Sequence, residues 1–388
     1  MFLSYFTAPS KDVFSVRDKS SSGTVGSVIS IFDGKVFPNL DQAKIAIFGV
    51  NESRGALIPN AQINMNCIRK EFYNLYLGSW DFEIIDLGDF KIGEKIQDTY
   101  FGLTDLISNL ISIGILPIMI GGGHDLCYAV YKAYESFNKG VNIASIDSRF
   151  DLISENSTKL NSKNFLGSIV KESPNHLNTY TNIGYQSYFV HRDESHEMEK
   201  MFFETLRLGD FRSNIKESEA YLRNSDIITF DMSSIRQSDA PSVISPSPNG
   251  FFANEACILS RYAGISDRSS FFGLFELNFF LKKNNQTSIL VSQIIWHFLE
   301  GFSLRIGDMP NEKNLTVNFN KYLVPIDNGD YQFVFYKSKM SGRWWMSSTT
   351  DFNSENLNEV IVPCSYQDYL DSVDGRIPSR MTRLLRLM

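Results

Sequence analysis

Cysteine is scarce in this chain and is never closely paired. The four cysteines are scattered over the sequence, at Cys67, Cys127, Cys257 and Cys364. Zinc knuckles and disulfide frameworks need cysteines at short, regular spacings. The spacing argues against both kinds of site, and we expect a reducing, cytoplasmic environment.

Long apolar segments and an excess of basic charge are also missing. No uninterrupted apolar stretch approaches the roughly 20 residues that span a bilayer, so we expect no membrane span. The 388 residues carry a formal net charge of -7, with a pI near 5.4. This charge argues against a nucleic-acid partner, because nucleic-acid binders present a basic surface. Small polar ligands remain compatible with the chain.

What the chain does contain is an alternation of apolar runs with segments of helical periodicity. Continuous rather than alternating hydrophobicity fits strands that are covered on both faces of a parallel sheet. The predicted strands are 44–50, 82–88, 115–121, 141–147, 179–185, 226–232 and 270–277. The predicted helices are at about 61–77, 101–113, 125–138, 192–208, 253–262 and 285–301. The order βαβα predicts an α/β fold with a mostly parallel, doubly wound sheet.

The pattern changes near residue 303. Short predicted strands with polar turns follow, at 320–326, 331–337 and 359–364, and then short helices. We therefore predict an N-terminal extension at 1–42, an α/β domain at 43–302 and a C-terminal α+β appendage at 303–388. Trp344 and Trp345 either pack the appendage on the main domain, which we favour because aromatic residues dominate cores, or form a partner-binding surface.

Acids and one histidine follow the predicted strands at their carboxyl ends, where open α/β sheets bind ligands. The residues are His124, Asp147, Asp151, Asp231 and Glu276. Imidazole and carboxylate groups on rigid strand ends suit a divalent metal that activates water. An isolated pair of aspartates four apart would more simply cap a turn and begin a helix. The convergence of several strands favours a metal site.

The motifs around these residues resemble the ureohydrolase superfamily, which includes arginase, agmatinase and formimidoylglutamase, from about 43 to 302. The resemblance rests on GGGHD (121–125), DSRFD (147–151), FDMSS (230–234), DAPSVISPSPNGF (239–251) and FFGLFELN (271–278). The third glycine of GGGHD is more typical of formimidoylglutamase than of arginase. The resemblance implies an arginase-like three-layer α/β/α fold.

The same resemblance implies how a metal centre would be built. The first manganese ion of the family would be held by His124, Asp147, Asp151 and Asp231. The second ion would share two of these aspartates and add a histidine and an aspartate of its own. Arg149 and Ser233 stand at those two positions. We therefore expect at most one manganese or other divalent ion and no second metal site.

Three further residues bear on activity by the same resemblance. Glu276 stands where the family anchors the guanidinium or amidine group of its substrate. Leu166 best matches a histidine that aids proton transfer. The guanidinium of Arg149 matches a carboxylate bidentately, so we expect it to pair with Asp147 or Asp231 and to replace the second ion electrostatically.

Two functions are compatible with this pattern. The absence of both ligands specific to the second ion and of the proton-transfer histidine favours a non-catalytic relative of formimidoylglutamase. Such a protein would bind a small amidine or guanidino ligand, or a protein partner through residues 303–388. The alternative is a single-metal amidine hydrolase that cleaves N-formimidoyl-L-glutamate to glutamate and formamide. A homo-oligomer is compatible with either function, because relatives form trimers and hexamers.

Overall fold

The computed structural model describes residues 2–56, 61, 63–153, 159–279, 285–311, 313–326, 331–347 and 360–382. Its centre is a ten-stranded sheet in which nine strands follow the order β1-β4-β3-β5-β10-β9-β6-β7-β8 and β2 pairs with β4. All neighbouring strands are parallel except β1 and β4. The strands are β1 (Phe6–Thr7), β2 (Ser30–Ile31), β3 (Ala43–Val50), β4 (Glu83–Phe90), β5 (Leu116–Ile120), β6 (Val141–Ile146), β7 (Leu177–Tyr185), β8 (Glu204–Arg207), β9 (Ile227–Asp231) and β10 (Phe271–Phe275).

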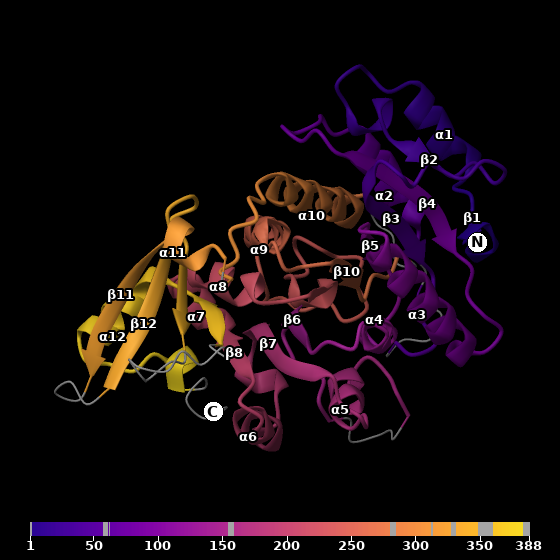
Figure 1. Ribbon diagram of the computed structural model, residues 1–388. Helices are drawn as coiled ribbons and strands as arrows, with labels where there is room; N and C mark the ends of the chain where they lie inside the picture. Colours follow the sequence, from indigo (N-terminus) through magenta and orange to yellow (C-terminus); the bar gives the residue numbers. More distant parts are fainter. Residues whose placement is uncertain are drawn as a thin grey trace.

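Helices cover both faces of this sheet, which makes three layers (Figure 1). One face is covered by α2 (Met65–Tyr73), α9 (Ala253–Ile265) and α10 (Gln286–Ser303), and the other by α3 (Ile96–Ser112), α4 (Leu126–Glu135) and α5 (Phe165–Val170). Successive side chains of a strand point to opposite faces, so Ile118 and Ile120 of β5 enter one core while Met119 enters the other. The predicted α/β/α fold is confirmed.

Two stretches differ from the pattern expected from the sequence. The predicted helix 192–208 ends early, because α6 (Arg192–Lys200) is followed by Phe202 with a left-handed φ of 54° and then by β8. Short α7 (Leu208–Ser213) and α8 (Glu217–Arg223) follow. The predicted N-terminal extension contains α1 (Lys11–Asp18) and adds β1 and β2 to the edge of the main sheet, beside β4.

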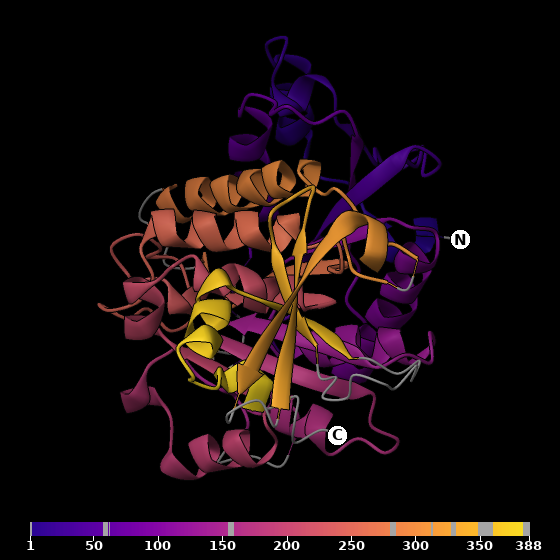
Figure 2. The ribbon, with the colours of Figure 1, turned by 60° about the vertical axis from the view of Figure 1, so that its left-hand side comes forward.

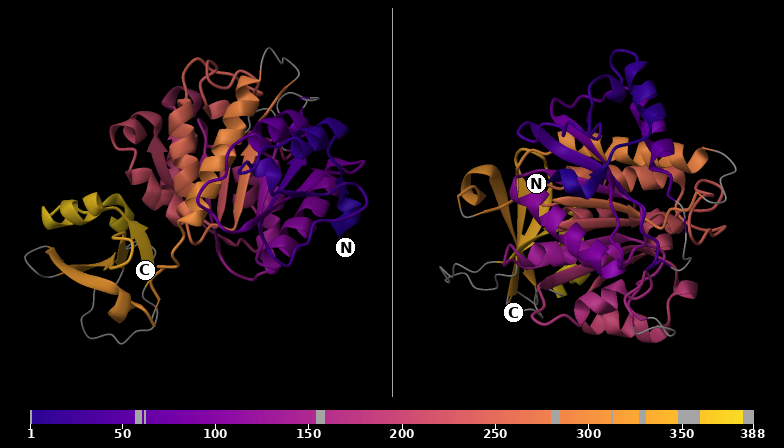
Figure 3. Two further views of the ribbon diagram at one scale, coloured as in Figure 1. Left: turned by 90° about the horizontal axis from the view of Figure 1, so that it is seen from above. Right: turned by 90° about the vertical axis from the view of Figure 1, so that its right-hand side faces the viewer.

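The C-terminal appendage forms a second sheet that is entirely antiparallel. Its strands are β11 (Phe319–Ile326), β12 (Tyr331–Ser338), β13 (Trp344–Ser347) and β14 (Ile361–Cys364), and α11 (Leu315–Asn318) and α12 (Tyr366–Val373) flank it. Figure 1 and the left view of Figure 3 show this sheet beside the main domain, on the side away from the N-terminal strands, and Figure 2 shows it from the front. Phe335 and Met346 are among the residues of its own small core.

A buried arginine of the main domain holds the appendage in place. Arg223 of α8 donates from Nη2 to the carbonyl oxygens of Trp344 and Cys364, both at 3.1 Å, and its Cζ lies 4.3 Å from the centroid of the Trp345 ring. Trp344 and Trp345 are both buried. The Trp344 ring packs inside the appendage, against Tyr369, so only the Trp345 ring, which lies against Arg223, contacts the main domain as expected.

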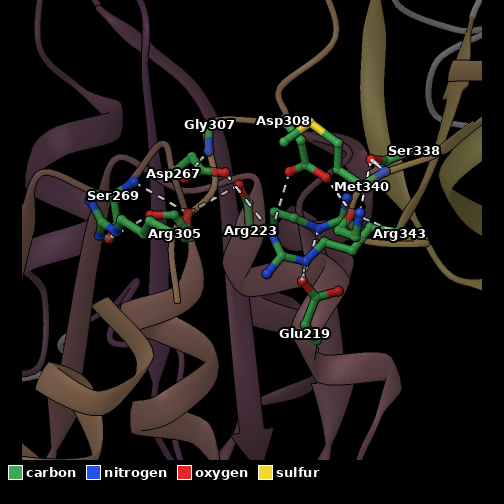
Figure 4. A network of polar contacts seen from close by, with 12 residues as sticks. Glu219, Arg223, Asp267, Ser269, Arg305, Gly307, Asp308, Ser338, Met340 and Arg343 are labelled. Carbon is green, nitrogen blue, oxygen red and sulfur yellow. Dashed lines mark hydrogen bonds and ion pairs between the residues drawn. The ribbon is translucent and has the colours of Figure 1, made fainter. Parts of the chain in front are cut away.

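A second arginine extends the junction from the appendage side. Arg343 lies 3.6 Å from Glu219 of α8 and 3.5 Å from Asp308, atom to atom (Figure 4).

Asn142 at the start of β6 lines a cleft together with Ile361 and Val362 of β14. The appendage therefore docks near the amino-terminal ends of the central strands.

The described residues contain no helix with both the length and the apolar character that a bilayer crossing requires.

Candidate metal centre

The candidate ligands gather at the carboxyl ends of four neighbouring strands. His124 follows β5, Asp147 and Asp151 follow β6, Asp231 ends β9, and Glu276 follows β10. These strands lie side by side in the order β5-β10-β9-β6. The fold thus brings together residues that are up to 152 positions apart, and it does so at the edge opposite the appendage.

His124, Asp147, Asp151 and Asp231 form a compact, buried cluster. Each offers one ligand atom, and these atoms lie within 4.8 Å of one another. The Nδ1 atom of His124 lies 3.2 Å from Asp147 Oδ2 and 3.8 Å from Asp151 Oδ2. None of the four side chains is more than 3% exposed, so a bound ion would be largely shielded from bulk water.

The ring of His124 is oriented by its neighbours. Its Nε2 lies 3.0 Å from Thr229 Oγ1, whose own hydroxyl donates to Ser145 Oγ at 3.1 Å. These two hydrogen bonds place the ring proton on Nε2, so the lone pair of Nδ1 faces the aspartates. Burial also lowers the pKa of His124, which favours the neutral imidazole that binds metals.

The backbone around the cluster adopts uncommon conformations. Gly121 and Gly122 have φ values of 100° and 84°, which L side chains rarely adopt, and a Cβ on Gly121 would lie 2.7 Å from the Val50 carbonyl oxygen. Asp151 and Glu276 also have positive φ, at 52° and 63°. Such strain in non-glycine residues gathers at functional sites.

Several polar atoms of the cluster have no hydrogen-bond partner. These buried atoms are His124 Nδ1, Asp147 Oδ2, Asp151 Oδ1 and Asp151 Oδ2. Buried polar atoms in native proteins are normally satisfied, and one imidazole with carboxylates is a donor set for a divalent transition metal. The four residues therefore fit one divalent ion, whose bonds would satisfy these atoms.

The protonation of the cluster predicts an unusual pH dependence. Burial, and then the neighbouring Asp231, raise the pKa of Asp147 and of Glu276 to about 8, far above the value of about 4 in an unfolded chain. The protonated forms therefore stabilise the metal-free fold fully below about pH 4, and this contribution is lost as the pH rises through about 8. Thermal melts in EDTA are expected to show a falling Tm from pH 5 to 8.5.

Two controls test the origin of that pH dependence. Asp147→Asn should make the fall in Tm shallower, because the amide does not titrate while Glu276 still does, and saturating Mn²⁺ should raise the Tm most at high pH. A Tm in EDTA that is constant or rises over this range would contradict the prediction.

The side chain of Arg149 turns away from the acids. Its Nη1 donates to the Phe189 carbonyl oxygen at 3.2 Å, and its Cζ lies 4.2 Å from the centroid of the Phe189 ring. Only its backbone N–H reaches Asp147 Oδ1, at 2.9 Å. Within the described part of the chain, no ion pair joins its guanidinium to Asp147 or Asp231. The bidentate pairing expected from the sequence is not formed, because the Phe189 ring and carbonyl bind the guanidinium instead.

The cation that does face the cluster is Lys163, which the sequence interpretation missed. Its Nζ lies 3.7 Å from Asp151 Oδ1, and its side chain is 19% exposed. Lys163 stands in the loop before α5, where no periodicity indicates the direction of a side chain. The one feature of the sequence that could have indicated Lys163 is that it precedes Leu166, the residue that matches the family's proton-transfer histidine, by three positions.

The remaining expected site residues lie close to the cluster. Ser233 is buried, donates its backbone N–H to Asp231 Oδ1 at 2.6 Å, and accepts from Ser245 N at 3.3 Å. Leu166 is fully buried in the apolar core. Glu276 accepts from the His124 backbone N–H at 2.8 Å and is 2% exposed, so its carboxyl group adjoins the cluster.

Comparison with known proteins adds independent evidence. The family model described as Arginase family matches residues 43–300. A formimidoylglutamase of Staphylococcus aureus is 26% identical over 229 residues, which cover 56% of this chain and 72% of that protein.

Solved structures resemble the same region. The formiminoglutamase of Trypanosoma cruzi with Mn²⁺ has a TM-score of 0.60 at 19% identity, covering 70% of this chain and 100% of that one. The formimidoylglutamase of Bacillus subtilis has a TM-score of 0.63 at 18% identity, covering 77% and 95%. The agmatine ureohydrolase of Thermoplasma volcanium has a TM-score of 0.56 at 21% identity, covering 74% and 97%. At these identities the likeness shows a shared fold.

Proposed function

The chain belongs to the arginase family, and from this premise we propose that it is a formimidoylglutamase-like protein that holds at most one divalent ion and acts by binding rather than by hydrolysis. One observation carries the proposal. The ligand set of one ion converges in a buried cluster, while Arg149 and Ser233 stand where the resemblance expects the second ion's own ligands.

The local chemistry supports a non-catalytic role. A divalent ion, when bound, supplies a Lewis acid that lowers the pKa of coordinated water. The hydroxyl of Ser233 is a far weaker ligand than the carboxylate it replaces. Leu166 has no group that can accept or donate a proton, so the position expected to aid proton transfer is chemically inert.

The proposed ligand is a small amidine or guanidino compound. Glu276 is the acid on which this proposal depends, because its carboxyl group adjoins the metal cluster and could pair with a planar cation. A protein partner on the appendage is less well supported, because Trp344 and Trp345 are buried.

A single-metal amidine hydrolase is the second candidate. The same Glu276 favours it, together with the complete ligand set for one ion. Such an enzyme would cleave N-formimidoyl-L-glutamate to glutamate and formamide with water activated by one ion, and it would need a proton acceptor other than Leu166.

Two measurements on purified protein separate these candidates. We expect metal analysis after Mn²⁺ loading to give at most one tightly bound ion per chain. We also expect no turnover of N-formimidoyl-L-glutamate in the range of roughly 1 to 1000 per second that is typical of enzymes. The formimidoylglutamase of Bacillus subtilis, assayed in parallel, is the positive control. Two tightly bound ions, or turnover in that range, would overturn the proposal.

A further inference from the structure

Lys163 is the one side-chain cation that approaches the carboxylates of the cluster within the described ranges. Its ammonium lies 3.7 Å from Asp151 Oδ1, and 19% of its side chain is exposed. Arg149, the cation expected there from the sequence, is held by Phe189. The structure has therefore placed a lysine from the loop before α5 against the acids that would bind metal.

The charge of Lys163 acts on the whole cluster. Burial raises the pKa of Asp147, Asp151, Asp231 and Glu276, and the Lys163 ammonium opposes this rise in each of them. Burial alone would lower the pKa of Lys163, but the same four acids together raise it above its usual value. By position, the Lys163 ammonium is the side-chain cation nearest to the cluster within the described ranges, with its Nζ 3.7 Å from Asp151 Oδ1.

Charge balance explains why a cation is needed here. Asp147, Asp151, Asp231 and Glu276, when ionised, carry a charge that two dications would neutralise in a binuclear centre. One dication leaves part of this charge uncompensated, and repulsion between like charges is strong where water is excluded. A lysine ammonium is a compact point charge on a flexible stem, so it can reach such a cluster without bidentate geometry.

We propose that Lys163 is a built-in counter-cation that takes over the electrostatic role of the absent second ion, stabilises the metal-free cluster and weakens the binding of a divalent ion at the remaining site. The inference rests on the proposed one-ion function and deepens it. Because the ammonium approaches Asp151, which is also a candidate ligand, lysine and metal compete for the same carboxylate. The site would then fill only when divalent ion is abundant.

The test compares Lys163→Met, which removes the charge but keeps an unbranched stem, with Lys163→Arg, which keeps the charge. Mn²⁺ affinity is measured by calorimetric titration, and the Tm of EDTA-treated protein by thermal melts. We expect Lys163→Met to bind Mn²⁺ at least about tenfold more tightly, because a positive charge 3.7 Å from Asp151 Oδ1, an oxygen of a candidate ligand, has been removed. Its metal-free Tm should be lower than that of the unsubstituted protein, and Lys163→Arg should stay near that protein in both measurements.

Lys171→Met is the matched control. Lys171 is the exposed residue that follows α5, at the far end of the same short helix, so its loss should change neither quantity. Lys163→Gln provides a second neutral variant if the methionine variant does not fold.

The possible outcomes separate this inference from the proposed function. Unchanged affinity and unchanged metal-free Tm in both neutral variants would overturn the role of Lys163. If no variant binds Mn²⁺, the competition between Lys163 and the metal is refuted, while the proposed function, which allows at most one ion, stands. A metal-free Tm that is lower in Lys163→Met but not in Lys163→Arg would still support the counter-cation. Two bound ions in the unsubstituted protein would overturn both.

Discussion

Replacing Asp231 with asparagine is expected to weaken Mn²⁺ binding by at least roughly 100-fold. Asp231 ends β9 at the centre of the cluster, and it is one of three carboxylates that could hold the ion. Substitutions that only disturb the orientation of a ligand already cost about 10- to 100-fold in metal affinity, so loss of a charged ligand should cost more. Calorimetric titration or metal analysis after dialysis measures the effect.

A matched control lies just before the other end of the same strand. Asp226 accepts from the Asn142 backbone N–H and pairs with Arg268, near the appendage. Asp226→Asn removes the same formal charge without touching the cluster, so it should leave Mn²⁺ affinity within about twofold. Equal losses in the two variants would show that the effect is global and would contradict the assignment of Asp231 as a ligand.

Replacing Arg69 with methionine is expected to lower the free energy of unfolding by about 3 to 5 kcal/mol. Arg69 of α2 is buried and forms two hydrogen bonds to Asp86 of β4, at 2.8 and 3.2 Å, and one to Asp89 at 2.7 Å. Its loss would leave the Asp86 carboxylate buried without its counter-charge. Urea unfolding followed by circular dichroism measures the change.

Arg261→Met is the control for that experiment. Arg261 of α9 pairs with Glu300 of α10 at 2.8 Å, but both side chains are more than a third exposed. Exposed ion pairs contribute at most about 1 kcal/mol, so this variant should unfold nearly as the unsubstituted protein does. A loss from Arg69→Met that is as small as that from Arg261→Met would mean that Asp86 finds another partner or protonates.

Much of the fold could be predicted because the central strands are buried on both faces. Continuous apolar runs such as 115–121 and 226–232 correspond to β5 and β9 within a few residues. The prediction of one helix over 192–208 was wrong. Helical periodicity indicates which side chains share a face, but it does not indicate where the backbone leaves the helical conformation. The left-handed residue Phe202 and the polar edge strand β8 replace its last part.

The position of the C-terminal appendage on the main domain could not be predicted from the sequence either. Its short strands were visible as apolar runs, but nothing in them indicated which edge of the main sheet they approach. Buried contacts between Arg223 and Trp344, far apart in sequence, determine that position. The division at 1–42, 43–302 and 303–388 stays a prediction, although β1 and β2 join the main sheet.

The sequence by itself determined which chemical groups stand at the strand ends. Parallel strands place their carboxyl ends at one edge, so His124, Asp147 and Asp231 had to meet once the strands were recognised. The resemblance to the ureohydrolases places Arg149 and Ser233 where the histidine and aspartate of a second ion are expected, so the sequence predicts at most one ion. Only the tertiary structure decided which cation lies against the acids. The conformation of a side chain in a loop depends on contacts with residues that are distant in sequence. Arg149 therefore binds Phe189, while Lys163 approaches Asp151.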